Sequence, residues 1–228
     1  MTPVTRKRYQ ESLDALRGDV VGMGELVLDH LKGGLESLST GDEALAREVI
    51  DGDDAVNEIY LDLEDRCIDL FALQQPVAGD LRFVAASFKI ITDLERIADL
   101  ATNLGRYALS GDEGLEPEVS IGDIGDVAID LVERSLRAYE SGDVDACHRI
   151  AADDDELDAL CLRASESLAR DLIEHEAGGD GPWTAERLLD DVSTILLAVR
   201  DLERVGDHAV NVAARTLYMV ENDPALLY

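Results

Sequence analysis

Aromatic residues and cysteine pairs are scarce in this sequence of 228 residues, and both shortages narrow its structural class. Aromatic residues make up 4% of the chain, and the apolar residues, 46% in all, are mostly Leu, Val, Ile and Ala. This mixture favours helices over sheets, and no segment shows the apolar–polar alternation of a half-buried strand. The three cysteines form no Cys-x-x-Cys motif and cannot all pair with one another. We therefore expect a helical protein with free thiols in a reducing compartment.

Long apolar runs are missing as well. The sequence has no run of about 18 apolar residues, the length that a membrane-spanning helix needs. Its N-terminal segment, MTPVTRKRYQ, is basic but lacks the apolar stretch of a secretory signal. These absences predict a cytoplasmic protein.

Positive charge is the third shortage. The 20 basic residues, of which only three are Lys, face 50 acidic ones, which gives a formal net charge of −30. Such a surface repels nucleic-acid phosphates and anionic lipids, so we expect no nucleic-acid partner and no direct membrane binding. The acidic residues are spread along the chain, which favours a halophile with a salt-rich cytoplasm over a dedicated acidic binding surface.

The sequence is rich in helical periodicity. Turn signals built from Gly, Pro and Asp separate segments in which apolar residues recur at i, i+3, i+4 and i+7. This pattern predicts an all-α fold with no β-sheet. The six expected helices lie near residues 6–38, 43–72, 77–109, 118–140, 143–176 and 184–220.

An eleven-residue stretch occurs twice. DLERIADLATN begins at Asp93 and DLERVGDHAVN at Asp201, 108 positions later, and seven of the eleven residues are identical. An acidic stretch precedes each copy, DGDDAVN at 51–57 and ADDDELD at 152–158. The order of motifs predicts an internal duplication that yields two tandem, pseudo-symmetric three-helix bundles. The expected repeats are residues 1–112 and 113–228.

Both copies place a Glu and an Asp four residues apart on a helix that is otherwise strongly apolar. Carboxylates in such a place must be paired, hydrogen-bonded, protonated or bound to a cation. One interpretation pairs them with Arg96 and Arg204 on the same helices. The other adds the acidic stretches of the neighbouring antiparallel helices and forms sites for a hard cation. The candidate metal ligands are Glu95, Asp99, Glu203, Asp207, Asp53, Asn57, Asp154 and Asp158.

No motif for covalent catalysis is present. The sequence lacks a Gly-rich phosphate loop, a nucleophile elbow and the Glu-x-x-His pairs of ferritin-like di-iron centres. We therefore expect a protein that is not an enzyme. Two alternatives stay open: a metal-dependent hydrolase with a carboxylate-bridged centre, and a metal-free helical adaptor.

The doubled DLER stretches and three further landmarks resemble the PhoU family of phosphate-uptake regulators. VIDGDDAVN (49–57), QQPVAGDLRFV (74–84) and SFKIITDLERIAD (87–99) follow the family's order and spacing, and the resemblance covers roughly residues 10–220. It implies two similar three-helix bundles and a cytoplasmic negative regulator of high-affinity phosphate uptake.

The resemblance also implies partners. Members of this family act on the phosphate ABC transporter, so the ATPase subunit of that transporter is the expected partner and the only link to the membrane. A phosphate-signalling protein and a second copy of the chain, in a homodimer, are further expected partners.

Multinuclear iron or zinc clusters on the bundle surface are the implied cofactors. The family holds them through its Glu/Asp-x-x-x-Asp motifs, which correspond here to Glu95 with Asp99 and to the Glu and Asp of the second copy. Ala98 replaces the usual Gly in the first copy, and Tyr60 stands where many relatives have an acidic residue. Both departures would weaken a cluster on the first bundle.

Overall fold

The structure, a computed structural model, describes residues 3–73, 78–110, 120–178 and 182–227. Within these ranges it contains six α-helices and no strand, which confirms the all-α prediction. Each expected segment corresponds to one helix, with ends that differ by a few residues. The helices are α1 (Pro3–Thr40), α2 (Glu43–Leu73), α3 (Ala78–Ser110), α4 (Ile121–Ser141), α5 (Val144–Gly178) and α6 (Pro182–Glu221).

Two of the predicted turn signals have the expected geometry. Gly41 and Gly142 follow α1 and α4 with φ angles of 67° and 71°, the left-handed conformation that glycine adopts most easily. Asp42 and Asp143 then accept hydrogen bonds from backbone N–H groups at the start of the next helix. Another Gly-Asp turn signal, in the Ser-Gly-Asp sequence at 110–112, extends beyond the described residues, and the predicted boundary between the repeats lies outside them.

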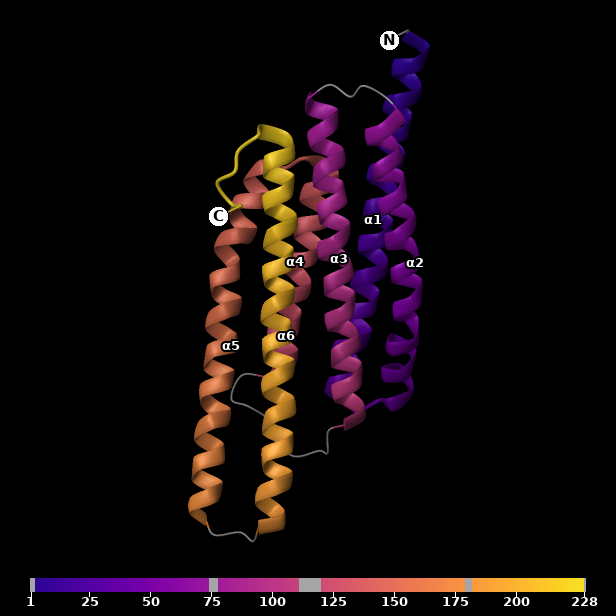
Figure 1. Ribbon diagram of the computed structural model, residues 1–228. Coiled ribbons are helices and arrows are strands. Elements are labelled where there is room, and N and C mark those ends of the chain that lie inside the picture. The colour runs from indigo at the N-terminus through magenta and orange to yellow at the C-terminus, as the bar shows by residue number, and fades with distance from the viewer. Residues whose placement is uncertain (1–2, 74–77, 111–119, 179–181, 228) are drawn as a thin grey trace.

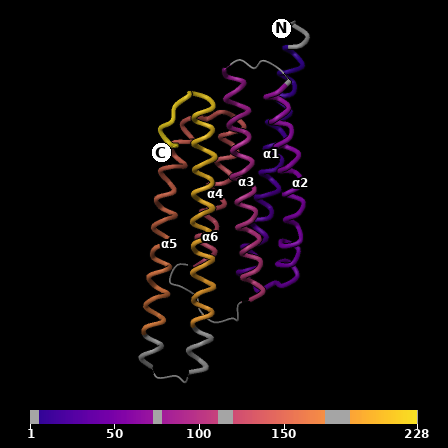
Figure 2. Tube along the Cα trace, in the orientation of Figure 1, coloured from indigo at the N-terminus to yellow at the C-terminus, as the bar shows by residue number. Residues whose placement is uncertain are grey.

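The helices form two sets of three that meet at α3 and α6 (Figures 1 and 2). In the described residues α3 packs against α1, α2 and α6, while α6 packs against α3, α4 and α5. The central pair runs antiparallel, and α2 and α5 lie on its two outer sides (Figure 1). None of the helices, as far as the structure describes them, is both long and apolar enough to cross a membrane.

Equivalent residues of the two halves make reciprocal contacts where α1 meets α4. A Cβ on Gly24 would lie 2.4 Å from a methyl carbon of Leu136, and one on Gly125 would lie 2.3 Å from a methyl carbon of Leu35. Both pairs of equivalent positions are 101 residues apart. Glycine therefore lets the helices approach closely, and the reciprocity shows an approximate twofold axis between the halves.

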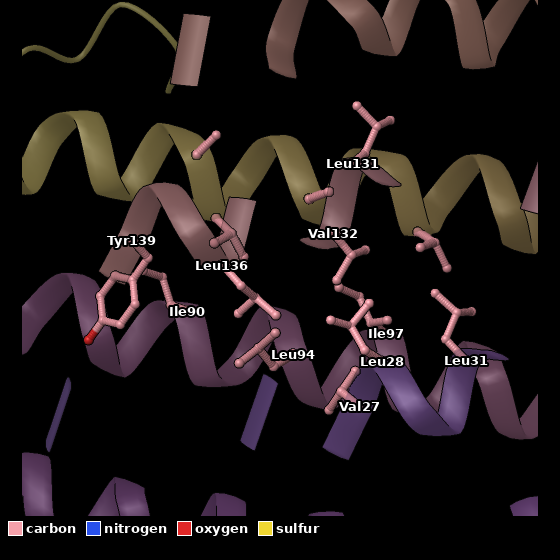
Figure 3. Packing of buried hydrophobic residues seen from close by; sticks show 14 of the residues in the cluster. Val27, Leu28, Leu31, Ile90, Leu94, Ile97, Leu131, Val132, Leu136 and Tyr139 are labelled. Carbon is pink, nitrogen blue, oxygen red and sulfur yellow. The ribbon is translucent and has the colours of Figure 1, made fainter. Parts of the chain in front are cut away.

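One apolar core runs through both halves (Figure 3). Leu31 of α1, Ile97 of α3 and Leu131 of α4 are essentially fully buried in it. Each such side chain contributes about 1.5–3 kcal/mol by leaving water. Because this core surrounds α3 and α6, polar residues on those two helices lie either in the contact between the bundles or at the rim.

Candidate functional site

The first and last residues of the repeated stretch connect the two bundles. Asn211 donates its Nδ2–H to Oδ1 of Asp93 over 3.3 Å, and Asn103 donates to Oδ2 of Asp201 over 3.1 Å. The two Asp–Asn pairs are reciprocal, because each joins the start of one copy to the end of the other. Sequence reasoning missed this role, although identity at both ends of the repeat was a signal for it.

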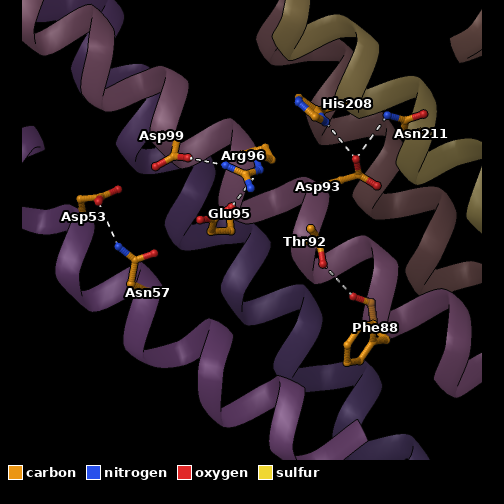
Figure 4. Close-up of polar contacts among 10 residues, drawn as sticks. All are labelled: Asp53, Asn57, Phe88, Thr92, Asp93, Glu95, Arg96, Asp99, His208 and Asn211. Atoms are coloured by element: carbon orange, nitrogen blue, oxygen red, sulfur yellow. Dashed lines mark hydrogen bonds and ion pairs between the residues drawn. The ribbon is translucent and has the colours of Figure 1, made fainter. Parts of the chain in front are cut away.

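Each Asp–Asn pair also receives a partner from the opposite bundle, and this partner differs between the halves. His208 Nδ1 lies 2.9 Å from Oδ1 of Asp93 (Figure 4), and the Tyr107 hydroxyl donates to Oδ2 of Asp201 over 2.9 Å. Asp201 is fully buried. Burial and the hydrogen bond to Asp201 together raise the pKa of Tyr107 to about 12. His208 thus serves the contact between the bundles.

The first carboxylate face, formed by Asp53, Asn57, Glu95 and Asp99, contains its own hydrogen-bond donors. Asn57 donates to one oxygen of Asp53 over 3.0 Å, and Thr102 of α3 donates to the other over 3.3 Å. Both oxygens of Asp53 are therefore occupied by neutral donors (Figure 4 shows the pair with Asn57).

Arg96 forms ion pairs with both motif acids of this face. Its Nε lies 3.4 Å from Glu95, and its Nη1 lies 3.2 Å from Asp99 (Figure 4). Burial raises the pKa of Glu95, the charges of Asp99 and Asp53 add to that effect, and Arg96 opposes it. With side-chain exposures of 19% and 43%, Glu95 and Asp99 lie at the rim of the bundle. The structure thus brings Asp53 near the motif, and the arginine interpretation fits the first face.

The second carboxylate face, formed by Asp154, Asp158, Glu203 and Asp207, has no such donors. None of the four has a hydrogen-bond or ion-pair partner in the described part of the chain, and Oδ1 of Asp154 is a buried oxygen with none. Burial raises the pKa of Asp154 to about 6, with further effects from the other three acids. Burial and mutual repulsion also raise the pKa values of Asp158 and Glu203. The four predicted ligands thus come together.

One substitution between the copies and one differently directed arginine accompany this difference. A Cβ on Gly206 would lie 2.4 Å from Leu157 and 2.6 Å from Oδ1 of Asp154, so glycine is what allows α5 to approach α6 here. Ala98 occupies the equivalent position of the first copy and is fully buried. Arg204, the equivalent of Arg96, lies 3.6 Å from the buried Asp201.

A concentration of carboxylates without a cation is suited to binding a hard metal ion through oxygen. As the side chains lie, no three His, Cys, Asp or Glu residues among those described are arranged to hold one ion. Binding would therefore require rotation of side chains on the second carboxylate face. The Asp154 oxygen supports the fit, because a buried acceptor without a partner is costly and a cation would satisfy it.

Comparison with known proteins gives consistent matches over both halves. The model of the PhoU domain family matches residues 20–108 and 121–216. The chain is 30% identical to a "Phosphate-specific transport system accessory protein PhoU homolog" of Pseudomonas putida, over 94% of this chain and 81% of that protein. It is 31% identical to "homolog 1" of the same description from Thermotoga maritima, over 95% and 90% of the two chains.

Solved structures match as well. The crystal structure of PhoU from Pseudomonas aeruginosa superposes with a TM-score of 0.83 at 29% identity, covering 94% of this chain and all of that one. The phosphate transport system regulatory protein PhoU from Streptococcus pneumoniae gives a TM-score of 0.82 at 24% identity, a likeness of fold.

Proposed function

Because the chain belongs to the PhoU family, we propose that it is a cytoplasmic negative regulator of high-affinity phosphate uptake. It acts by binding the ATPase subunit of the phosphate ABC transporter, which is its only link to the membrane, and it also contacts a phosphate-signalling protein. The observation that carries the proposal is the family match to both halves of the chain. Relatives covered over 81–90% of their length bear the name of accessory proteins of phosphate-specific transport.

Deletion in the native host tests this function. In phosphate-replete cells, loss of the protein should raise the rate of labelled phosphate uptake, and the wild-type gene supplied in trans should restore the low rate. The ATPase subunit should co-purify with the tagged chain from the same cells. An unchanged uptake rate after deletion, together with no recovery of the ATPase subunit, would exclude the proposal.

We further propose that the second carboxylate face binds iron or zinc. Asp154, Asp158, Glu203 and Asp207 would hold the ion, whose positive charge would offset the repulsion among them. The partnerless oxygen of Asp154 and the lack of a nearby cation among the described residues support this assignment. The first carboxylate face fits an ion less well, because Asn57 and Arg96 already satisfy its oxygens.

Metal content and stability test the second proposal independently of phosphate uptake. Protein purified without chelator should contain iron or zinc by elemental analysis, and chelation should lower its melting temperature. The site would be excluded if the purified protein contains no metal and its melting temperature does not change on addition of chelator or of iron or zinc. This result would leave the regulatory proposal intact.

A further inference from the structure

A groove of about 580 Å³ opens between α2, α3 and α6, and no residue of either carboxylate face lines it. Its floor is α3, since α2 and α6 both contact α3 but do not contact each other in the described residues (Figure 1). Sites for small molecules usually have volumes of about 300–1,000 Å³. The groove is therefore large enough for one small organic ligand.

Aromatic rings are concentrated at this groove. The chain has three phenylalanines in all, and two of them, Phe71 and Phe88, belong to the lining. Phe71 is 36% exposed, and Ile68, which is 50% exposed, supplies further apolar surface. In a protein with so few aromatic residues, these rings provide a surface against which a flat ring can stack.

Two cations without partners line the same groove. Neither Lys89 nor Arg215 has a hydrogen bond or ion pair with any other described residue, and Nε of Arg215 is buried without an acceptor. The other two lysines of the chain, Lys7 and Lys32, form ion pairs with glutamates. Two unpaired cations in one groove of a protein with 50 acidic residues favour an anionic ligand.

The two cations lie across from each other on the antiparallel helices α3 and α6. Asp93 of α3 is bonded to Asn211 of α6, and Lys89 lies one turn before Asp93 while Arg215 lies one turn after Asn211. Asp93 is the one acid among the described lining residues, and its Oδ1 contacts His208 and Asn211 rather than Lys89 (Figure 4). Both positive charges are therefore available to a ligand.

These two charges match one phosphate monoester. Such a group carries a charge of about −1.5 to −2 at neutral pH, whereas a carboxylate would offset only one of the two cations. A guanidinium binds phosphate through two parallel N–H groups, and an ammonium adds a point charge. A phosphate would also supply the acceptor that Nε of Arg215 lacks.

The other half of the molecule lacks this combination. Uncharged residues without a phenyl ring replace the aromatic and cationic lining of α3 and α6: the equivalents of Phe88, Lys89 and Arg215 are Leu196, Leu197 and Tyr107. Tyr107 donates its hydroxyl to Asp201. Arg200, which replaces Thr92, lies 3.5 Å from the same buried acid. The cationic, aromatic groove is thus not a product of the repeat, and one site is expected per chain.

We propose that the groove binds a nucleoside phosphate. The base lies against Phe71 and Phe88, and the phosphate is held between Lys89 and Arg215. Proteins commonly stack nucleobases on aromatic side chains, and a nucleoside monophosphate combines the flat ring and the dianion that this lining suits. Inorganic phosphate would leave the rings without a partner, and a nucleoside would leave the cations without one.

Isothermal titration calorimetry at about 0.15 M salt tests the class of ligand. Chelator is present, so that no metal on the carboxylate faces contributes. The probes are the monophosphates of adenosine, guanosine, cytidine and uridine, with adenosine and inorganic phosphate as partial ligands. At least one monophosphate should bind at one molecule per chain, and each partial ligand should bind at least about tenfold more weakly. The proposal is overturned if no monophosphate binds with a Kd below about 1 mM, or if either partial ligand binds equally well.

Matched substitutions locate the site. Lys89→Gln and Arg215→Gln should each raise the Kd about tenfold or more, because each removes one of the two cations. Phe88→Leu should also weaken binding, since leucine offers no flat ring. Lys7→Gln removes the same charge at an 81%-exposed side chain of α1 and should leave the Kd unchanged.

Circular dichroism verifies that the variants remain helical. Binding that is unchanged in both Lys89→Gln and Arg215→Gln would place the ligand elsewhere and overturn the proposal. A loss of affinity in Lys7→Gln equal to that in Lys89→Gln would have the same consequence, because it would show a response to net charge alone.

Discussion

The two copies of the DLER stretch carry the same acids but use their arginines differently. Arg96 contacts both Glu95 and Asp99, whereas Arg204 is directed toward the buried Asp201. An arginine of the same helix thus partly offsets the charge of the first carboxylate face, whereas no acid of the second face has an ion-pair partner among the described residues. The repeated motif therefore sets where the acids lie, while neighbouring residues determine what those acids can bind.

Residues of α2 and α5, the helices that face the two motifs, add to this difference between the carboxylate faces. Asn57 in α2 donates a hydrogen bond to Asp53, but its equivalent in α5 is Asp158, an acid that instead raises the pKa of Asp154. The metal-free adaptor interpretation therefore suits the first half, and a cation site suits the second. What the halves share is the reciprocal Asp–Asn contact between the bundles.

The largest effect should come from breaking that shared contact. Asp201→Ala removes a fully buried acceptor and leaves Asn103 and Tyr107 without their partner, so we expect a loss of about 3 kcal/mol in the free energy of unfolding. Asp93→Ala should cost less, because Asp93 is 14% exposed and its donors can reach water. Urea unfolding measures both, and Asp54→Ala, at an exposed site, should stay within about 0.5 kcal/mol of wild type. Equal losses for Asp54 and Asp201 would contradict the role of the Asp–Asn pairs.

Matched double variants should separate the two carboxylate faces. Glu203→Gln with Asp207→Asn should lower bound iron or zinc about tenfold or more, because both substitutions remove anionic ligands. Glu95→Gln with Asp99→Asn, the equivalent change in the first copy, should leave most of the metal in place. Elemental analysis of the two proteins after identical purification provides the measurement. If both double variants lose the same amount of metal, the two faces do not differ in metal binding.

Local signals made the fold predictable from the sequence. The apolar periodicity predicted the six helices, and the Gly-Asp turns predicted two of the helix boundaries, because both patterns depend only on residues close together in the sequence. Spacing also predicted that Asp53 would lie near the Glu95 motif, and that Asp154 would lie near its second copy. The orientation of Arg204 was not predictable, since it depends on Asp201 being drawn into the contact with the other bundle. Likewise, the identical ends of the repeat indicated that Asp93 and Asn211 matter, but residues so far apart in sequence carry no local pattern that shows their contact.

The pH dependence of stability should also reveal the difference between the two carboxylate faces. Burial among acids raises the pKa of Asp154 from 3.8 to about 6, so the native state binds more protons than the unfolded state between these values. The free energy of unfolding should therefore fall as pH rises through this window. Asp154→Asn removes that penalty and should be more stable than wild type at neutral pH, with the advantage lost below about pH 4. Melting temperatures measured with chelator present provide the test. Asp53→Asn is the matched control: both oxygens of Asp53 accept hydrogen bonds in the wild type, so this substitution should not increase stability at neutral pH.

The smallest expected effect tests the arginines directly. Arg96 lowers the pKa of Glu95, so Arg96→Gln should raise that pKa further, and only slightly, because an exposed ion pair contributes only about 0.2–1 kcal/mol. Arg204→Gln should leave the pKa of Glu203 unchanged, since burial, Asp158 and Asp207 account for its shift. Side-chain carboxyl chemical shifts followed by NMR through a pH titration measure both glutamates. If the two substitutions raise the two pKa values equally, Arg204 screens the second face as Arg96 screens the first, and the distinction between the halves would rest on Asn57 and Asp158 alone.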